Sequence, residues 1–162
     1  MNHIFRVIST ILAISAANVA FAGDIILTVS GKVATSTNNN LWEFDRAALE
    51  ALPASTIRTT TIWTEGPQVF QGVSLAVLLD HVGAEDGTIL AVALNDYAVK
   101  IPTTDAMEDG PIIAYQRNDA ALSVRDRGPL WIIYPFDDNE IYRSEEYYSR
   151  SIWQLDHIVI ED

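Results

Sequence analysis

Cysteine is absent from the 162-residue chain, and histidine is scarce, with three residues. Without a thiol the protein cannot form disulfides, bind zinc or an iron–sulfur cluster through thiolates, or use a cysteine nucleophile. His81 and His157 lie far apart in the sequence, so they make a poor transition-metal site. We therefore expect the fold to depend on its apolar core, with no metal held by this chain's own side chains.

Positive charge is also scarce, since 10 lysine and arginine residues stand against 22 acidic residues, a net charge of −12. Such a surface repels nucleic acid and anionic membranes, so neither is expected as a partner. Beyond the N-terminal region, no apolar stretch reaches the roughly 20 residues needed to cross a bilayer.

The first 22 residues have the pattern of a secretory signal peptide. Arg6 precedes the apolar stretch "VISTILAISAANVAFA", which closes on the small-x-small triplet at 20–22 before Gly23. A membrane anchor is the alternative, but four polar residues interrupt the stretch: Ser9, Thr10, Ser15 and Asn18. We expect cleavage after residue 22, a mature domain over 23–162, and a periplasmic or secreted protein. No Arg–Arg pair precedes the apolar stretch, which favours export of an unfolded chain.

The pattern along the rest of the chain predicts mostly short strands. Strands are expected at 24–33, 55–64, 88–102 (two, joined at Asn95–Asp96), 111–118, within 125–138 and at the end of 145–162. Helices are expected at 44–53, with Asp45 as N-cap, and at 73–83, with Ser74 as N-cap. A single helical turn is expected at 104–110. There is no regular strand–helix alternation, so we expect an α+β fold, a single compact domain of mixed, mostly short strands in packed sheets with a few short helices.

Four segments, in order, resemble the sulfite-oxidase-type oxidoreductase molybdopterin-binding domain family. They are "FQGVSLAVLL" (70–79), "ALNDYAVKIP" (93–102), "LSVRDRGPLWIIYP" (122–135) and "SRSIWQLDHIVI" (149–160). The resemblance implies packed sheets around a groove that holds a pterin-dithiolene molybdenum cofactor, with one cysteine thiolate on the metal. Because that cysteine falls just before the first segment, its place here is taken by Trp63, Thr64 or a near neighbour. The resemblance thus makes molybdopterin possible, while the missing thiolate favours a chain without a cofactor.

The loop between the expected strand at 55–64 and helix at 73–83 is the first candidate site. Trp63, Thr64, Glu65 and Phe70 would line it, and aromatic and hydroxyl groups suit a small organic ligand. The alternative is that Trp63 only caps the core. Asp96 and Tyr97 match an Asp-Tyr pair of the family and would shape the groove; alternatively, with Asn95, they only support a turn.

Three arginines stand out in a chain so poor in basic residues. Arg125, Arg127 and Arg150, the last followed by Ser151 in the family's Arg-Ser position, would form an anion site, because guanidinium groups bind phosphate and carboxylate through two hydrogen bonds. The alternative is that they pair with the surplus acids, such as Asp126, Asp137 or Glu146. The aromatic residues Tyr142, Tyr147, Tyr148 and Trp153 could form a partner surface or simply pack.

Two functions follow from these expectations. The first is an exported ligand- or partner-binding module with the molybdopterin-domain fold and without molybdenum catalysis. Its partner would be a small anionic ligand or a protein. The second is a molybdopterin-dependent periplasmic oxidoreductase whose metal site uses no cysteine.

Overall fold

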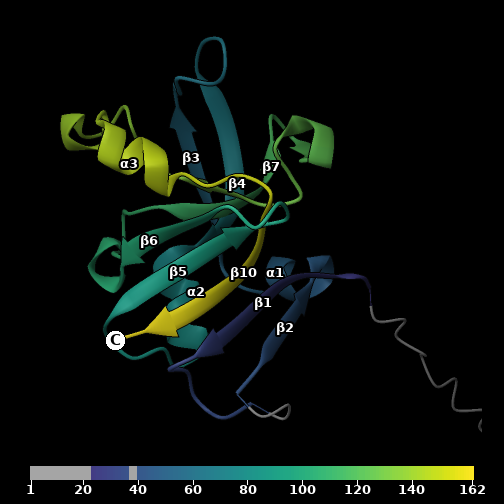
Figure 1. Ribbon diagram of the computed structural model, residues 1–162. Coiled ribbons are helices and arrows are strands. Elements are labelled where there is room, and N and C mark those ends of the chain that lie inside the picture. Colours follow the sequence, from purple (N-terminus) through teal and green to yellow (C-terminus); the bar gives the residue numbers. More distant parts are fainter. Residues whose placement is uncertain (1–22, 37–39) are drawn as a thin grey trace, which may run out of the picture.

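The computed structural model describes residues 23–36 and 40–162 (Figure 1). The expected signal peptide, at 1–22, lies outside the described residues. In the described part, no helix is long and apolar enough to cross a bilayer.

Ten strands and six short helices make up the described chain. The strands are β1 (Ile25–Gly31), β2 (Trp42–Asp45), β3 (Ala54–Thr59), β4 (Gln68–Ser74), β5 (Thr88–Ala93), β6 (Ala98–Pro102), β7 (Ile112–Arg117), β8 (Ala120–Ala121), β9 (Trp131–Ile133) and β10 (Leu155–Glu161). The α-helices are α1 (Arg46–Glu50), α2 (Leu75–His81) and α3 (Glu145–Arg150). The 3₁₀ helices are η1 (Thr103–Asp105), η2 (Val124–Asp126) and η3 (Glu140–Tyr142).

The strands form two five-stranded sheets. The first has the order β2-β1-β10-β5-β6, in which only the β1–β10 pair is parallel. The second has the order β3-β4-β7-β8, and β9 pairs with the first half of β7. The α+β fold class with mixed short strands and few helices is therefore confirmed.

Apolar side chains from both sheets meet in the main core. It includes Leu27 and Ile158 from the first sheet, Val73 and Ile132 from the second, and Leu78 from α2. The other face of the second sheet carries a smaller cluster, whose residues are Ile57, Phe70, Ile112, Ala114, Leu122, Trp131 and Ile133. Because side chains alternate along a strand, the strands β7 and β9 have buried residues on both faces of the second sheet, whereas the edge strand β3 has one exposed face.

Three strands were missed by the sequence analysis, one of them the two-residue β8 (Ala120–Ala121). Residues 42–45 form β2 ahead of the helix, which shortens the helix expected at 44–53, and residues 68–74 form β4 where a loop and a helix start were expected. The reason is tertiary, since β4 is hydrogen-bonded to β3 on one side and to β7 on the other. The strand expected at 55–64 ends at Thr59, because the next backbone N–H, of Thr60, donates to the Asp137 carboxylate instead of to a strand.

Both predicted N-cap residues lie at the N-terminus of their helices, but only one of them makes the capping hydrogen bond. The Asp45 carboxylate accepts a 2.8 Å hydrogen bond from the Ala48 N–H, which confirms it as the N-cap of α1. Ser74 occupies the N-cap position of α2, but its hydroxyl makes no hydrogen bond within the described residues.

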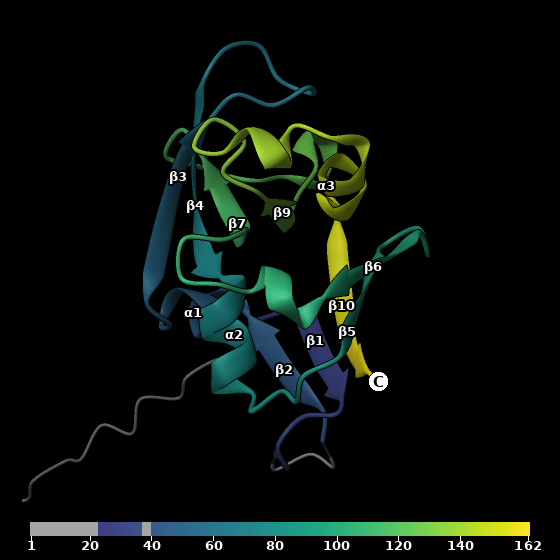
Figure 2. The same cartoon turned by 90° about the vertical axis from the view of Figure 1, so that its left-hand side faces the viewer.

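Three connecting segments meet at one end of the domain. The β3–β4 loop projects above α3 in both views (Figures 1 and 2). The turn between β5 and β6 and the stretch joining α3 to β10 complete this end, and residues of all three segments line one pocket.

Candidate functional site

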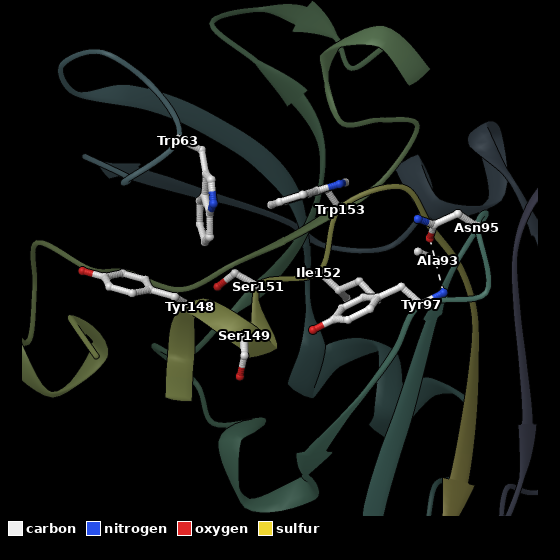
Figure 3. Close-up of a pocket in the computed structure, with 9 residues that line it drawn as sticks. All are labelled: Trp63, Ala93, Asn95, Tyr97, Tyr148, Ser149, Ser151, Ile152 and Trp153. Carbon is white, nitrogen blue, oxygen red and sulfur yellow. Dashed lines mark hydrogen bonds between the residues drawn. The ribbon is translucent and has the colours of Figure 1, made fainter. Parts of the chain in front are cut away.

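The pocket where these segments meet has a volume of about 390 Å³ (Figure 3). Four aromatic side chains line it, namely Trp63, Tyr97, Tyr148 and Trp153. The polar lining consists of Asn95, Ser149 and Ser151, and Ala93 and Ile152 complete it. A concave, mostly apolar cavity with a few polar groups is the usual form of a small-molecule site.

Trp63 is the centre of an aromatic cluster. Its ring lies edge-on to those of Trp131 (5.7 Å between centroids), Tyr148 (5.8 Å) and Trp153 (5.7 Å), an arrangement that aromatic pairs prefer. Its backbone N–H also donates to the Thr61 hydroxyl at 3.1 Å. Trp63 therefore packs against both core clusters and also forms a wall of the pocket.

Asp137 fixes the start of the Trp63 loop. Its carboxylate accepts 2.6 Å hydrogen bonds from the Thr60 amide and from the Thr60 hydroxyl, and it forms a 3.1 Å ion pair with Arg143. In return, the Asp137 N–H donates to the Thr59 hydroxyl at 3.0 Å. Hydrogen bonding to the Thr60 hydroxyl, with smaller contributions from its amide and from Arg143, lowers the pKa of Asp137 below its usual 3.8.

Asp137→Asn should destabilise the protein by about 1 kcal/mol at pH 7 and have no effect in acid. Because the pKa of Asp137 is lower in the folded than in the unfolded chain, its stabilisation is complete above the unfolded pKa and disappears as the pH falls through the folded pKa. Urea unfolding of both proteins from pH 7 to pH 2 measures this difference. A difference that stayed constant across the series would contradict the role given to this carboxylate.

A buried network holds α3, which carries Tyr148 and Ser149, against the domain. The Asp105 carboxylate accepts a 2.7 Å hydrogen bond from the Tyr134 hydroxyl and a 2.9 Å hydrogen bond from Arg150. Arg150 also pairs with Glu146 one helical turn earlier. Burial and the neighbouring Asp105 carboxylate raise the pKa of Tyr134 well above its usual value, so this phenol remains a hydrogen-bond donor.

The other two candidate arginines differ from each other. Arg127 has a left-handed backbone (φ 69°), and its guanidinium lies 5.4 Å from the ring centroid of Trp131 and 5.6 Å from that of Trp153. Arg125 is exposed in η2, and no ion pair to it exists within residues 23–36 and 40–162. Neither residue lines the pocket.

The structure brings three of the ten predicted site residues into one pocket, namely Trp63, Tyr97 and Ser151. Thr64 and Glu65 lie beside it in the same loop: the Thr64 hydroxyl is 2.8 Å from that of Thr61, and Glu65 is exposed. Asp96 is exposed at the β5–β6 turn with φ 64° and does not line the pocket.

Two predicted residues have different positions from those expected. Phe70 is fully buried in β4, 5.5 Å from the ring of Trp131, and lines no loop. The reason is the unforeseen strand, which turns this side chain into the smaller core cluster. Arg150 is neutralised by Asp105 and Glu146, so its pairing with Glu146, the alternative to an anion site, is confirmed.

Sequence reasoning left six pocket residues out of the predicted site: Ala93, Asn95, Tyr148, Ser149, Ile152 and Trp153. The aromatic pair and Asn95 had been noticed, but as packing, partner-surface or turn residues. Ser149 and Ile152 carry no sequence signal, because their place in the lining depends on how α3 and the segment after it pack against the domain.

Comparison with known families identifies the domain. The sequence profile described as "Oxidoreductase molybdopterin binding domain" matches residues 23–136, more than half of the chain. The chain belongs to this family. A solved structure, the sulfane dehydrogenase SoxCD from Paracoccus pantotrophus, is similar, with a TM-score of 0.64 and 18% sequence identity. The matched region covers 84% of this chain but only 38% of that chain, so the likeness concerns the fold alone. Among curated proteins, nothing matches this sequence.

The donor set at this pocket does not fit the thiolate-ligated molybdenum cofactor of the molybdopterin-binding family. The sequence has no cysteine, and the positions implied for the metal ligand offer an indole and a hydroxyl. Within the described residues, no group of three or more histidine, aspartate or glutamate side chains could hold a metal ion. A pterin phosphate calls for guanidinium or ammonium groups, whereas Arg150 is already paired with two carboxylates.

Proposed function

We propose that this family member is a ligand-binding module that does not perform molybdenum chemistry. The observation that carries the proposal is Trp63, an indole packed among four other aromatic rings in the loop where the resemblance puts the family's metal ligand. Indole supplies no lone pair to a metal, whereas its face and edge suit an organic ligand. The same pocket gains three further aromatic walls from Tyr97, Tyr148 and Trp153.

The proposal includes export and two kinds of partner. The N-terminal pattern supports cleavage before Gly23 and a periplasmic or secreted location. A small ligand would enter the pocket, and Arg127, which lies against the Trp153 ring, supports an anion at its rim. A protein partner is the alternative ligand, supported by the exposed apolar residues Leu94 and Tyr97 beside the cavity.

A second candidate function rests on family membership itself. It is a molybdopterin-dependent oxidoreductase whose metal has no cysteine ligand. The lack of fit between the donor set and the cofactor makes it the weaker of the two.

Metal analysis of the natively exported protein separates these functions. We expect folded protein that begins at Gly23 and contains far less than one molybdenum per chain, because no side chain of the pocket binds that metal strongly. Mass spectrometry of the intact chain and elemental analysis of the same sample provide the readouts. One molybdenum per chain would establish the second candidate instead, and a chain beginning at Met1 would contradict export with cleavage.

A further inference from the structure

We infer that the pocket takes a neutral, planar aromatic molecule that carries hydrogen-bond acceptors such as carbonyl oxygens or ring nitrogens. This inference rests on the proposed function and narrows it to one chemical class of ligand. It differs from the anionic ligand that the arginines suggested, and three properties of the pocket lead to it.

The first property is the charge of the lining. None of the nine residues that line the pocket in the described chain is acidic or basic. The nearby guanidinium of Arg127 is placed over the rings of Trp131 and Trp153, and that of Arg150 is paired with Asp105 and Glu146. An ion that lost its water in this cavity would gain no counter-charge from the lining, and such desolvation is costly. Neutral ligands avoid that cost.

The second property is a set of hydrogen-bond donors without a protein partner. The indole N–H of Trp63, the hydroxyl of Tyr97 and the side-chain amide N–H groups of Asn95 donate to no partner within residues 23–36 and 40–162. In Figure 3 the Tyr97 hydroxyl is turned across the pocket toward Ser149 and Ser151, and the Trp63 nitrogen lies on the side of the ring toward Trp153. Both donors need acceptor atoms on a ligand.

The serine hydroxyls have no hydrogen left to donate into the pocket. Ser149 donates to the Glu146 carbonyl at 2.7 Å, and Ser151 donates to the Tyr147 carbonyl at 2.8 Å. The Asn95 carbonyl oxygen accepts from the Tyr97 backbone N–H at 3.3 Å. The two serines therefore offer only acceptor lone pairs to the pocket, so a ligand that pairs with the donors of Trp63, Tyr97 and Asn95 must itself carry acceptor atoms.

The third property is the aromatic walls. Trp63 and Trp153 lie edge-on to each other with an interplanar angle of 78° and centroids 5.7 Å apart. Tyr97 is 53% exposed and Trp153 is 39% exposed, so parts of both rings have no protein neighbour. An aromatic ligand would cover these rings by stacking or edge contacts.

Four bicyclic probes of similar size test the inference on the metal-free mature protein. Coumarin is neutral and has carbonyl acceptors, naphthalene is neutral without acceptors, coumarin-3-carboxylate is an anion, and N-methylquinolinium is a cation. Tryptophan fluorescence and the indole N–H signals in NMR spectra report binding. We expect coumarin to bind about tenfold tighter than each of the other three, the effect of one or two hydrogen bonds, and to shift the Trp63 indole N–H signal.

Matched variants locate the binding. Trp63→Phe and Tyr97→Phe each keep an aromatic ring but remove a donor, and each should weaken coumarin binding about three- to tenfold. Trp42→Phe is the control, because Trp42 lies on β2 and its indole donates to the Ala34 carbonyl, away from the pocket. Melting temperatures of all variants verify that they are folded, and Tyr97→Phe, at an exposed position, provides the test if Trp63→Phe does not fold.

Any other binding result would contradict the inferred ligand class, but it would not test the proposed function. Tighter binding of the anion or the cation would contradict the neutral ligand. Equal binding of naphthalene and coumarin would show that the donors take no part, and no binding of any probe up to its solubility limit would reject the aromatic class. The proposed function fails separately, through molybdenum found in the exported protein.

Discussion

Gly72→Ala is expected to abolish folding of the domain. A Cβ atom at this position in β4 would lie 2.0 Å from the Ile113 carbonyl oxygen and 2.6 Å from its carbonyl carbon. These are backbone atoms of the neighbouring strand β7, so no side-chain rotation relieves the clash. The two strands would have to separate where residues 72–74 of β4 and 112–115 of β7 are buried. We expect a loss of more than about 4 kcal/mol, in the exceptional range for a single substitution.

Gly66→Ala is the control for this prediction. Gly66 lies in the β3–β4 loop, where an added methyl group would have no atom of the described chain within 4 Å, and its φ of +64° is the only obstacle. This left-handed backbone should cost about 1 kcal/mol with alanine. Circular dichroism and soluble yield compare the two variants. A folded Gly72→Ala protein with a melting temperature near that of Gly66→Ala would contradict the close strand approach.

Asp105→Ala is expected to have the second-largest effect, a loss of about 3 kcal/mol, or roughly 10 °C in melting temperature. The Asp105 side chain is 10% exposed and its partner Arg150 is 14% exposed. Removing the carboxylate would leave a buried guanidinium with only its helical neighbour Glu146, and the Tyr134 hydroxyl with no acceptor. Unpaired buried charges and donors are among the most costly defects in a folded protein.

Glu146→Ala is the matched control, because it removes the other carboxylate that pairs with Arg150. Glu146 is 63% exposed, and such surface pairs contribute at most about 1 kcal/mol. Thermal unfolding of both variants measures the contrast. Equal destabilisation would mean that the network around Asp105 does not anchor α3.

Loss of this anchor would also affect the pocket. Arg150 belongs to α3, and Tyr148 and Ser149, which line the cavity, belong to the same helix. If Asp105→Ala stays folded, its affinity for coumarin should fall as well, since one wall of the pocket is no longer held in place. The Asp137 carboxylate has the corresponding role for the part of the wall that Trp63 forms, because it binds Thr60 at the start of the Trp63 loop.

Much of the fold could be predicted from the sequence, because local patterns decide where most strands and caps occur. Asp45 at a helix start and the Asn95–Asp96 turn are examples of such patterns. β4 could not be predicted in this way. Its residues Gln68–Ser74 form a strand because β3 and β7 supply hydrogen bonds on both sides, and the sequence analysis assigned this segment to a loop and a helix start.

The candidate site was likewise predicted only in part. The Trp63 loop was recognised from its position before the "FQGVSLAVLL" segment, and Tyr97 and Ser151 from two further segments. The arginines were misleading, since their value as anion ligands depends on neighbours that the sequence does not reveal. Asp105, which neutralises Arg150, is 45 residues away in the chain.

The sequence by itself determined the family, the absence of a thiolate and the acidic surface, because these depend on which residues are present and in what order. The tertiary structure alone decided that Phe70 is buried, that Arg150 is paired, and that Trp63, Tyr97, Tyr148 and Trp153 surround one cavity. The physical reason is that burial and pairing are properties of neighbours in space, and the neighbours that matter here come from strands and loops that are distant in the chain.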